Sequence, residues 1–213
     1  MPVSNRVETI VSIIIPCRNE KDYIAGVLDS ILANDFPKEN LEVIVADGMS
    51  EDGTRSVIQD YAENWPFIRL VDNPKKIVPC ALNEAIRKAK GRIIMRMDAH
   101  AVYPPNYISR LVDALQELKA DNVGAAWETL PGGPGLVPKA IALALSHPFG
   151  VGNATYRLSN AADHAPIETD TVPFGCYRKD VFDKIGLFDE ELVRNQDNEL
   201  NERLKKAGGR IYL

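Results

Sequence analysis

The sequence is poor in the features that mark several large classes of protein. Its three cysteines are odd in number and far apart, and no Cys-x-x-Cys pair occurs among the 213 residues. This pattern indicates neither a disulfide framework nor a zinc site, and it favours a reducing, cytoplasmic compartment. No stretch approaches the roughly 18 apolar residues that a membrane-spanning helix needs. Residues 1–10 also lack the apolar core of a signal peptide.

Strong positive charge and the common nucleotide-binding motifs are also missing. The formal net charge is −5, and lysine and arginine form no block longer than the pairs at 75–76 and 205–206, so no nucleic-acid surface is expected. The first predicted strand is followed by Pro16-Cys-Arg-Asn-Glu20, which lacks the glycines of a dinucleotide-binding turn. No Gly-x-x-x-x-Gly-Lys-Ser/Thr loop occurs either. A phosphate group must therefore be held by another device.

Strand-like and helix-like segments alternate through the first hundred residues. Four short apolar runs predict strands, at 11–15, 41–46, 67–71 and 92–97. Three segments with apolar residues at helical spacing lie between them, at 24–32, 54–64 and 79–90. Gly91 is expected to end the last of these helices in a left-handed conformation. This order predicts an α/β protein with a Rossmann-like, mainly parallel central sheet flanked by helices.

The alternation becomes irregular in the second half of the chain. A helix with apolar residues on one face should begin near Pro104, and a final helix is expected at 195–207. The intervening features are a strand at 123–127, a flexible joint at 131–135 and a mobile loop over the site at 153–170.

The segment Asp98-Ala99-His100 follows the fourth predicted strand, where ligands bind in parallel sheets. If the chain stays extended, Asp98 and His100 point the same way, and Ala99 lets a neighbour lie close. The pair therefore outlines a bidentate metal clamp. In the alternative, Asp98 caps the following turn and His100 bonds to a carbonyl. Acidic strand ends at Asp47 and Asp98 would repel a bare diphosphate, so a divalent cation should lie between them and it.

Five motifs, in order and spacing, resemble those of the family 2 glycosyltransferases, inverting enzymes with the GT-A fold that use nucleotide-sugars. They extend over roughly residues 10–213 and lie at 11–20, 47–54, 81–91, 98–100 and 196–203. Asp98-Ala-His100 stands in the place of the family's Asp-X-Asp, and Gln196-Asp197-Asn-Glu199 in that of its Glu-Asp motif. The Asp-Ala-His variant is similar to bacterial exopolysaccharide enzymes of the succinoglycan-biosynthesis type.

The resemblance implies a donor site. Pro16, Glu20 and Asp47 would line the nucleoside pocket. Asp47 would bond the base or the ribose or, in the alternative, only shape the turn that follows its strand. Gly48 stands where the family often has a second acid, so the group that Asp47 contacts stays open. Asn83 would contact the donor or, equally, serve only in packing at the helix surface.

The same resemblance implies a metal site. Asp98 would bind the cation and, with Ala99, meet the ribose and diphosphate, while His100 replaces the second carboxylate. A neutral imidazole in place of a carboxylate shifts preference from Mg²⁺ toward Mn²⁺, so one of these two is the expected cofactor. The cation would neutralise charge that builds on the departing nucleoside diphosphate.

On the acceptor side the resemblance implies that Asp197 is the general base, which takes the proton of the acceptor hydroxyl. Its place in the first turn of a helix also has a purely structural explanation, the favourable interaction of an acid with the helix dipole. Gln196 replaces the usual Glu, so the pKa of Asp197 should be lower than in a Glu-Asp pair. Phe174, Gly175 and Trp127 would contact the acceptor or the transferred sugar, although Trp127 could instead belong to the core.

The resemblance implies a metal-dependent, inverting transfer of a hexose, with UDP-glucose as the first choice of donor. The acceptor would be a saccharide or a lipid-linked saccharide in exopolysaccharide synthesis. The alternative is a module of the same fold that binds a nucleotide-sugar or a saccharide without transfer, because His100 and Gln196 both replace acids. A sugar-phosphate nucleotidyltransferase is disfavoured by the missing glycine-rich turn.

Residues 1–127 are expected to form the nucleotide-sugar half, and 128–213 the acceptor half, of one catalytic domain. The strand-like Arg210-Ile-Tyr-Leu213 has no tail, so a longer, C-terminally extended protein is expected. That protein would be cytoplasmic, at the inner face of the cell membrane. The apolar segment 140–145 is either an ordinary buried helix or a surface that meets a lipid-linked acceptor.

Overall fold

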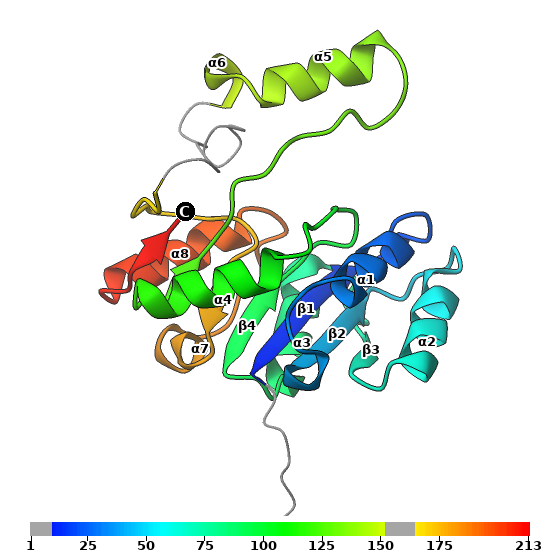
Figure 1. The fold of residues 1–213 in the computed structure, drawn as a ribbon, viewed down its shortest axis with the longest axis horizontal. Coiled ribbons are helices and arrows are strands. Elements are labelled where there is room, and N and C mark those ends of the chain that lie inside the picture. Colours follow the sequence, from blue (N-terminus) through cyan, green and yellow to red (C-terminus); the bar gives the residue numbers. More distant parts are fainter. Residues whose placement is uncertain (1–9, 152–164) are drawn as a thin grey trace, which may run out of the picture.

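The computed structural model describes residues 10–151 and 165–213. Within these residues, seven strands form one sheet in the order β3-β2-β1-β4-β6-β5-β7 (Figure 1). Their bounds are β1 (Val11–Cys17), β2 (Leu41–Asp47), β3 (Ile68–Asp72), β4 (Ile93–Arg96), β5 (Asn122–Val123), β6 (Cys176–Arg178) and β7 (Ile211–Tyr212). β1 to β4 run parallel, and β6 is antiparallel to both β4 and β5. The predicted α/β architecture with a mainly parallel sheet is therefore confirmed.

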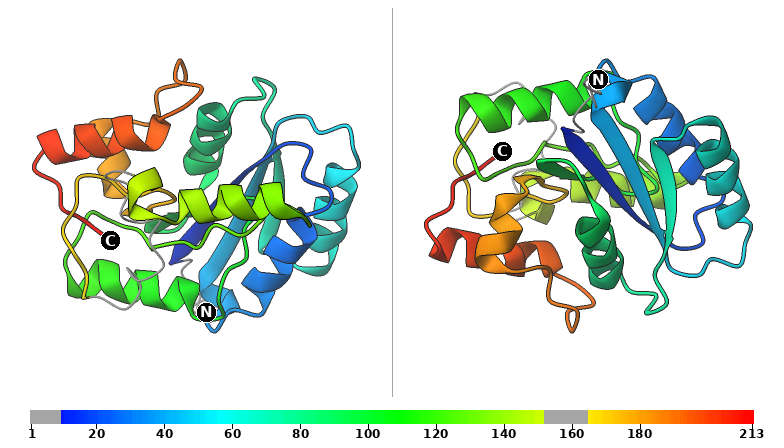
Figure 2. Two further views of the ribbon diagram at one scale, coloured as in Figure 1. Left: turned by 90° about the horizontal axis from the view of Figure 1, so that it is seen from above. Right: turned by 90° about the horizontal axis from the view of Figure 1, so that it is seen from below.

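Helices cover both faces of the sheet (Figures 1 and 2). Apolar residues of α1, α2 and α4 pack into one core with alternate residues of β1 and β2, and those of α3, α7 and α8 pack into a second core on the other face. The helix bounds are α1 (Ile24–Leu32), α2 (Thr54–Asn64), α3 (Val78–Lys88), α4 (Tyr107–Glu117), α7 (Asp180–Ile185) and α8 (Gln196–Lys206). A short 3-10 turn (Lys38–Asn40) precedes β2.

The strand register brings the carboxyl ends of β1, β2 and β4 to one edge of the sheet. Cys17 lies opposite Asp47, and Ile14 lies opposite Arg96. The loop after β1 and the segment after β4 therefore start side by side. This places the two segments that carry Glu20 and Asp98 next to each other, as ligand binding at strand ends requires.

Gly91 has a different role from the predicted one. Among the described residues, glycines with positive φ lie at 53, 135, 186 and 208, so Gly91 is not a left-handed cap. A Cβ at Gly91 would lie only 2.7 Å from the backbone nitrogen of Ser12, and the Gly91 amide donates to the Ser12 hydroxyl at 2.8 Å. Glycine is needed here because β1 passes directly against the turn that leads into β4.

Two further segments differ from expectation. The strand predicted at 123–127 is limited to Asn122–Val123, and the backbone bond from Gly124 to Tyr212 is the last of its ladder. Residues 124–127 are not part of any strand. Of the loop predicted at 153–170, residues 153–164 lie outside the described part. In the described part of this loop, the backbones of Ile167 and Leu213 donate a hydrogen bond to each other, both of 2.9 Å.

Two helices, α5 (Leu136–Leu145) and α6 (Pro148–Val151), extend away from the sheet (Figures 1 and 2). Most apolar side chains of α5 are exposed, with Leu136 86% and Leu143 70% accessible, whereas Ala142 is buried. The helix is therefore not the ordinary buried helix that was one of the two alternatives for this segment. No helix in the described ranges has both the length and the apolarity to cross a bilayer.

Candidate functional site

A cavity of about 180 Å³ opens at the carboxyl ends of β1, β2 and β4. Its wall brings together five residues that the sequence predicted for donor and metal binding, Pro16, Glu20, Asp98, Ala99 and His100. Other parts of the wall come from Gly48 and from the segment between β3 and α3. We call this space the donor cavity. Its position at the parallel strand ends is the usual place for a ligand in an α/β sheet.

Asp98 and His100 both face the donor cavity but have different surroundings. The Asp98 carboxylate is mostly buried and accepts hydrogen bonds from Arg96 at 3.1 and 3.3 Å. His100 is more than half exposed, and its Nδ1 lies 3.0 Å from a carboxylate oxygen of Glu20. His100 therefore pairs with a carboxylate, not with the carbonyl of the structural alternative. The side chain of Asp98 is thus engaged by Arg96, and the backbone amide of Asp98 donates to the Tyr103 hydroxyl at 2.6 Å.

These residues can hold a divalent cation only in part. In the described ranges, no group of three or more His, Cys, Asp and Glu side chains is placed to hold a metal ion. Asp98 and His100 would supply two ligands, and the other positions must come from phosphate oxygens and water. Mg²⁺ is usually bound in this way, by one or two protein ligands together with a phosphate substrate, and Mn²⁺ accepts the same oxygen ligands. The donor set thus fits a cation that arrives with a diphosphate.

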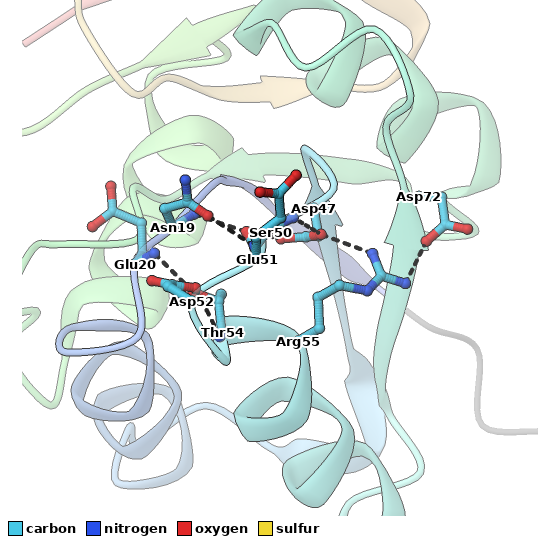
Figure 3. A network of polar contacts seen from close by, with 9 residues as sticks. All are labelled: Asn19, Glu20, Asp47, Ser50, Glu51, Asp52, Thr54, Arg55 and Asp72. Carbon is cyan, nitrogen blue, oxygen red and sulfur yellow. Dashed lines mark hydrogen bonds and ion pairs between the residues drawn. The ribbon is translucent and has the colours of Figure 1, made fainter.

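Asp47 lies at the end of β2 and is completely buried. Its carboxylate accepts hydrogen bonds from the Ser50 amide at 2.9 Å, from the Ser50 hydroxyl and from Arg55 at 2.7 Å. Arg55 also pairs with Asp72 at 2.7 Å (Figure 3). The structure therefore shows Asp47 shaping its turn, and its neighbour Gly48 is the residue that lines the donor cavity.

The loops after β1 and β2 are bound to each other (Figure 3). Asn19 receives a hydrogen bond from the Glu51 amide at 3.0 Å, and its own amide donates to Ser50 at 2.8 Å. The Glu20 amide donates to the Thr54 hydroxyl at 2.8 Å. These bonds fix the backbone of Glu20, so its carboxylate is presented to the donor cavity from a rigid loop.

Asn83 does not contact the donor cavity. It is buried in α3, where its amide nitrogen donates to the Phe188 carbonyl at 2.9 Å and to Glu190 at 3.0 Å. Its oxygen accepts from the Phe188 amide at 3.0 Å. Both ends of the side chain are thus used to anchor the loop after α7. Of the two alternatives for Asn83, these hydrogen bonds favour packing, and the wall of the donor cavity does not include this residue.

A second cavity, of about 280 Å³, lies beside the N-terminus of α8. It is lined by Trp127, Phe174, Asp197 and the loop that precedes α8, and we call it the acceptor cavity. The rings of Trp127 and Phe174 lie 4.8 Å apart. Gly175 is buried and does not line it: a Cβ there would lie 2.3 Å from Asn122 Oδ1. Glycine at this position is required by packing, so of the three residues predicted for the acceptor only Phe174 and Trp127 line this cavity.

Arg96 connects the two cavities, and sequence reasoning missed it. Its guanidinium makes two hydrogen bonds of 2.7 Å to the Asp197 carboxylate, in addition to its bonds to Asp98. The same group lies 4.9 Å from the centre of the Phe174 ring. A signal was present in the sequence: an arginine inside an apolar strand must have an anionic partner, because buried charges are otherwise too costly.

The ionisation of this cluster follows from burial and mutual charge. Burial lowers the pKa of Arg96, but the charges of Asp197 and Asp98 outweigh burial and raise that pKa above its ordinary value. Burial raises the pKa of Asp197; Arg96 opposes the rise and Asp98 adds to it. The like-charged neighbour of Asp197 is therefore Asp98, which follows β4, and not the residue at position 196. A buried carboxylate with a raised pKa is a feature of many acid–base sites.

The sequence matches the family model for Glycosyl transferase family 2 over residues 12–186, most of the chain. The chain belongs to this family. Among curated relatives, it is 34% identical over 206 residues to "Succinoglycan biosynthesis protein ExoA" of Rhizobium meliloti, covering 94% of this chain and 59% of that protein. A glucuronosyltransferase of Methanococcus voltae that acts on a dolichyl phosphate-linked sugar is 30% identical, with coverage of 95% and 63%. The glycosyltransferase chain thus spans about three fifths of these relatives.

Solved structures of glycosyltransferases share the fold of the chain, which is the expected GT-A fold. Mannosyltransferase PcManGT from Pyrobaculum calidifontis, in complex with GDP-Man and Mn²⁺, has a TM-score of 0.71 at 24% identity and covers 94% of this chain and 53% of that one. TarS 1-349 from S. aureus has a TM-score of 0.74 at 21% identity, with coverage of 95% and 57%. TarS 1-349 in complex with UDP-GlcNAc has a TM-score of 0.70 at 19% identity, covering 95% and 55%.

Proposed function

We propose that this chain is the catalytic domain of a metal-dependent, inverting hexosyltransferase that uses a nucleotide-sugar, with UDP-glucose as the first candidate. One observation carries the proposal: Asp98 faces a donor cavity, Asp197 faces an acceptor cavity, and both carboxylates contact Arg96 at the end of β4. An inverting transfer needs a group that holds the donor and a base that acts on the acceptor, and the positions of Asp98 and Asp197 in two adjoining cavities support these roles. The family membership supports the same reaction.

In the donor cavity, Pro16, Glu20 and Ala99 contact the nucleotide-sugar, and Asp98 with His100 holds Mn²⁺ or Mg²⁺ together with the diphosphate. A bound cation neutralises the negative charge that develops on the leaving nucleoside diphosphate. The complex of PcManGT with GDP-Man and Mn²⁺ supports a nucleotide-sugar donor that binds with a divalent cation. Asp47 acts indirectly, through the turn that brings Gly48 to the cavity wall.

In the acceptor cavity, Asp197 is the general base. Its carboxylate takes the proton of an acceptor hydroxyl while that oxygen forms a bond to the anomeric carbon of the sugar. The bond from the anomeric carbon to the phosphate oxygen breaks, and the nucleoside diphosphate leaves from the opposite face. The raised pKa of Asp197 favours this role, since a base works best when its pKa approaches the working pH. Trp127 and Phe174 offer aromatic surface on which a sugar ring can pack.

The acceptor is a saccharide or a lipid-linked saccharide in exopolysaccharide synthesis. The relative named as a succinoglycan biosynthesis protein supports the pathway class, and the relative that acts on a dolichyl phosphate-linked sugar supports a lipid-linked acceptor. Residues 1–127 supply the donor cavity, whereas 128–213 supply Phe174 and Asp197 to the acceptor cavity. The full-length protein works at the inner face of the cell membrane.

Calorimetric titration of UDP, GDP and UDP-glucose, with and without Mn²⁺, tests the donor site. We expect binding of a uridine nucleotide that depends on Mn²⁺ and is lost in Asp98→Ala. Asp113→Ala, which removes an exposed carboxylate on α4, is the matched control and should bind as the wild type does. No binding of any of the three with any metal would contradict the proposal.

Transfer is tested separately in the full-length protein with Asp197→Asn. This variant should keep its donor affinity and lose turnover, because the amide cannot accept the hydroxyl proton. Donor binding by the wild type without measurable transfer or hydrolysis would instead support the alternative, a module that binds the nucleotide-sugar without reacting it.

A further inference from the structure

Arg96 is held more rigidly than an arginine on a protein surface. Its side chain is only 6% exposed, and its backbone amide donates to the Gly175 carbonyl at 3.0 Å, which pins β4 to the segment that carries Phe174. The face of Phe174 packs against the guanidinium at 4.9 Å. A guanidinium that is fixed by a strand, an aromatic ring and two carboxylates has little freedom to change its direction.

The contact with Asp197 is of the kind that fixes direction as well as distance. Two hydrogen bonds of 2.7 Å diverge from one guanidinium nitrogen, Nη1, to the two carboxylate oxygens of Asp197. With both oxygens engaged, the carboxylate can neither rotate freely nor move away without breaking charge-assisted bonds. Asp197 lies 101 residues further along the chain, so this contact joins the first half of the protein to the second.

The first turn of α8 is also held through Asn198, whose Oδ1 accepts a hydrogen bond from the Thr171 hydroxyl at 3.0 Å. The residue before the helix, Asn195, has a left-handed backbone with φ of 62° and makes no side-chain capping bond. The body of α8 is anchored one turn later, where Asn201 bonds Asn122 at 2.8 Å and the Val172 carbonyl at 2.9 Å. Anchoring the helix and aiming the Asp197 carboxylate are therefore done by different residues, and the second task falls to Arg96.

Arg96 also separates two like charges. Asp98 faces the donor cavity and Asp197 faces the acceptor cavity, and the guanidinium contacts both. Without a cation between them, two carboxylates at a buried site repel each other and tend to move apart or take up a proton. A lysine could not replace this group fully, because the guanidinium contacts Asp197 through Nη1 and Asp98 through Nε and Nη2, whereas an ammonium has only one nitrogen.

We propose that Arg96 is a positioning residue of the transfer reaction, which aims the Asp197 carboxylate at the acceptor cavity and sets its place relative to Asp98. This rests on the proposed function, because it assigns Arg96 a task only if Asp197 is the base. Arg96 acts through Asp197 and Asp98 and takes no proton itself.

The test compares Arg96→Met and Arg96→Lys with the wild type and with Arg178→Met in the full-length protein. Arg178 lies on β6 and pairs with Asp180 on the surface, so it controls for the loss of an arginine and its ion pair. The probes are UDP-glucose, UDP-GlcNAc and GDP-mannose with Mn²⁺, and nucleotide release is followed for whichever donor the wild type turns over.

We expect kcat to fall about 100-fold in Arg96→Met and about 10-fold in Arg96→Lys, as for a displaced catalytic group. Affinity for the free nucleotide with Mn²⁺ should stay within an order of magnitude, so the loss lies in kcat. Arg178→Met should keep both the wild-type kcat and the wild-type affinity for the nucleotide. A crystal structure of Arg96→Met should show the Asp197 carboxylate turned away from its wild-type direction. In the double variant Arg96→Met/Asp197→Asn, the rate should equal that of Asp197→Asn alone.

Arg96→Lys or Arg96→Met with the wild-type kcat, or an unchanged Asp197 direction in the crystal, would overturn the positioning role. If Arg96→Met does not fold, Arg96→Lys, which keeps the charge, decides the question. Two results would show that the proposed function itself had failed: a wild type that releases nucleotide from none of the three donors, or an Asp197→Asn variant with undiminished kcat. An inactive Asp197→Asn together with fully active Arg96 variants would refute the positioning role alone.

Discussion

Replacing Asn83 with alanine should destabilise the protein by about 3 kcal/mol while leaving nucleotide binding intact. The side chain is 1% exposed and makes two hydrogen bonds to the backbone of Phe188, at 2.9 and 3.0 Å, and one to Glu190 at 3.0 Å. A net contribution of roughly 1 kcal/mol for each bond gives this sum. Phe188 is also buried, so its backbone groups would have no ready replacement from water.

The assay is thermal unfolding followed by circular dichroism, together with calorimetric titration of UDP and Mn²⁺ at a temperature where the variant is folded. For a chain of this size, 3 kcal/mol corresponds to a decrease of roughly 6 to 12 °C in Tm. Asn64→Ala is the matched control, because Asn64 is exposed and its side chain bonds a carbonyl within its own helix. It should change the free energy of unfolding by less than about 0.5 kcal/mol.

Two results would refute the reasoning. A Tm for Asn83→Ala equal to that of the wild type would mean that the bonds to Phe188 and Glu190 contribute nothing. A folded Asn83→Ala that no longer binds UDP would restore Asn83 to the donor site.

Three further predictions concern acid stability, packing and the acceptor. Hydrogen bonds from Asn83 and Lys75 lower the pKa of Glu190 from 4.5 to about 2. The stabilisation that ionised Glu190 provides is therefore complete above pH 4.5 and is lost as the pH falls toward 2. In urea unfolding from pH 6 to 3, the free energy of unfolding of Glu190→Gln should decrease less than that of the wild type, and an identical decrease would contradict this. In the same assay, Gly91→Ala should lower the free energy of unfolding by at least about 2 kcal/mol. Gly132→Ala is the control and should leave it unchanged, because Gly132 has open space around it. Equal effects of the two substitutions would refute the close approach of β1 to Gly91. Trp127→Ala should raise the acceptor KM about ten-fold without changing nucleotide affinity, measured against the exposed Trp65→Ala; unchanged acceptor kinetics would exclude Trp127 from the acceptor cavity.

The parts of the site that depend on neighbouring residues in the chain could be predicted from the sequence. Apolar periodicity located the strands, and the parallel order of β1 and β4 required the segments after them to meet. Pro16, Glu20 and Asp98 therefore lie at one cavity, as predicted. These predictions succeeded because a strand's period and its carboxyl end are local properties, and because parallel strands align their ends.

The parts that depend on distant partners could not be predicted in the same way. Nothing near Asn83 in the sequence announces that its amide is used by Phe188, 105 residues away. Asp47 was expected to meet the nucleoside, but Arg55 and Ser50 occupy its oxygens once the turn has folded. Only Arg96 left a readable sign, a charge inside an apolar strand, and its partner Asp197 still required the sheet to be assembled.

The order of the strands has a consequence for exchanging specificity between relatives. β6, from the second half of the chain, lies between β4 and β5, which both come from the first half. A hybrid joined near residue 127 would therefore place a foreign strand inside the sheet, next to the strand that carries Arg96. Such a hybrid would have to match its new β6 to β4 and β5 on both sides before any acceptor preference could be transplanted. Grafting the loop that precedes α8 would disturb no strand and is the more practical route to a different acceptor.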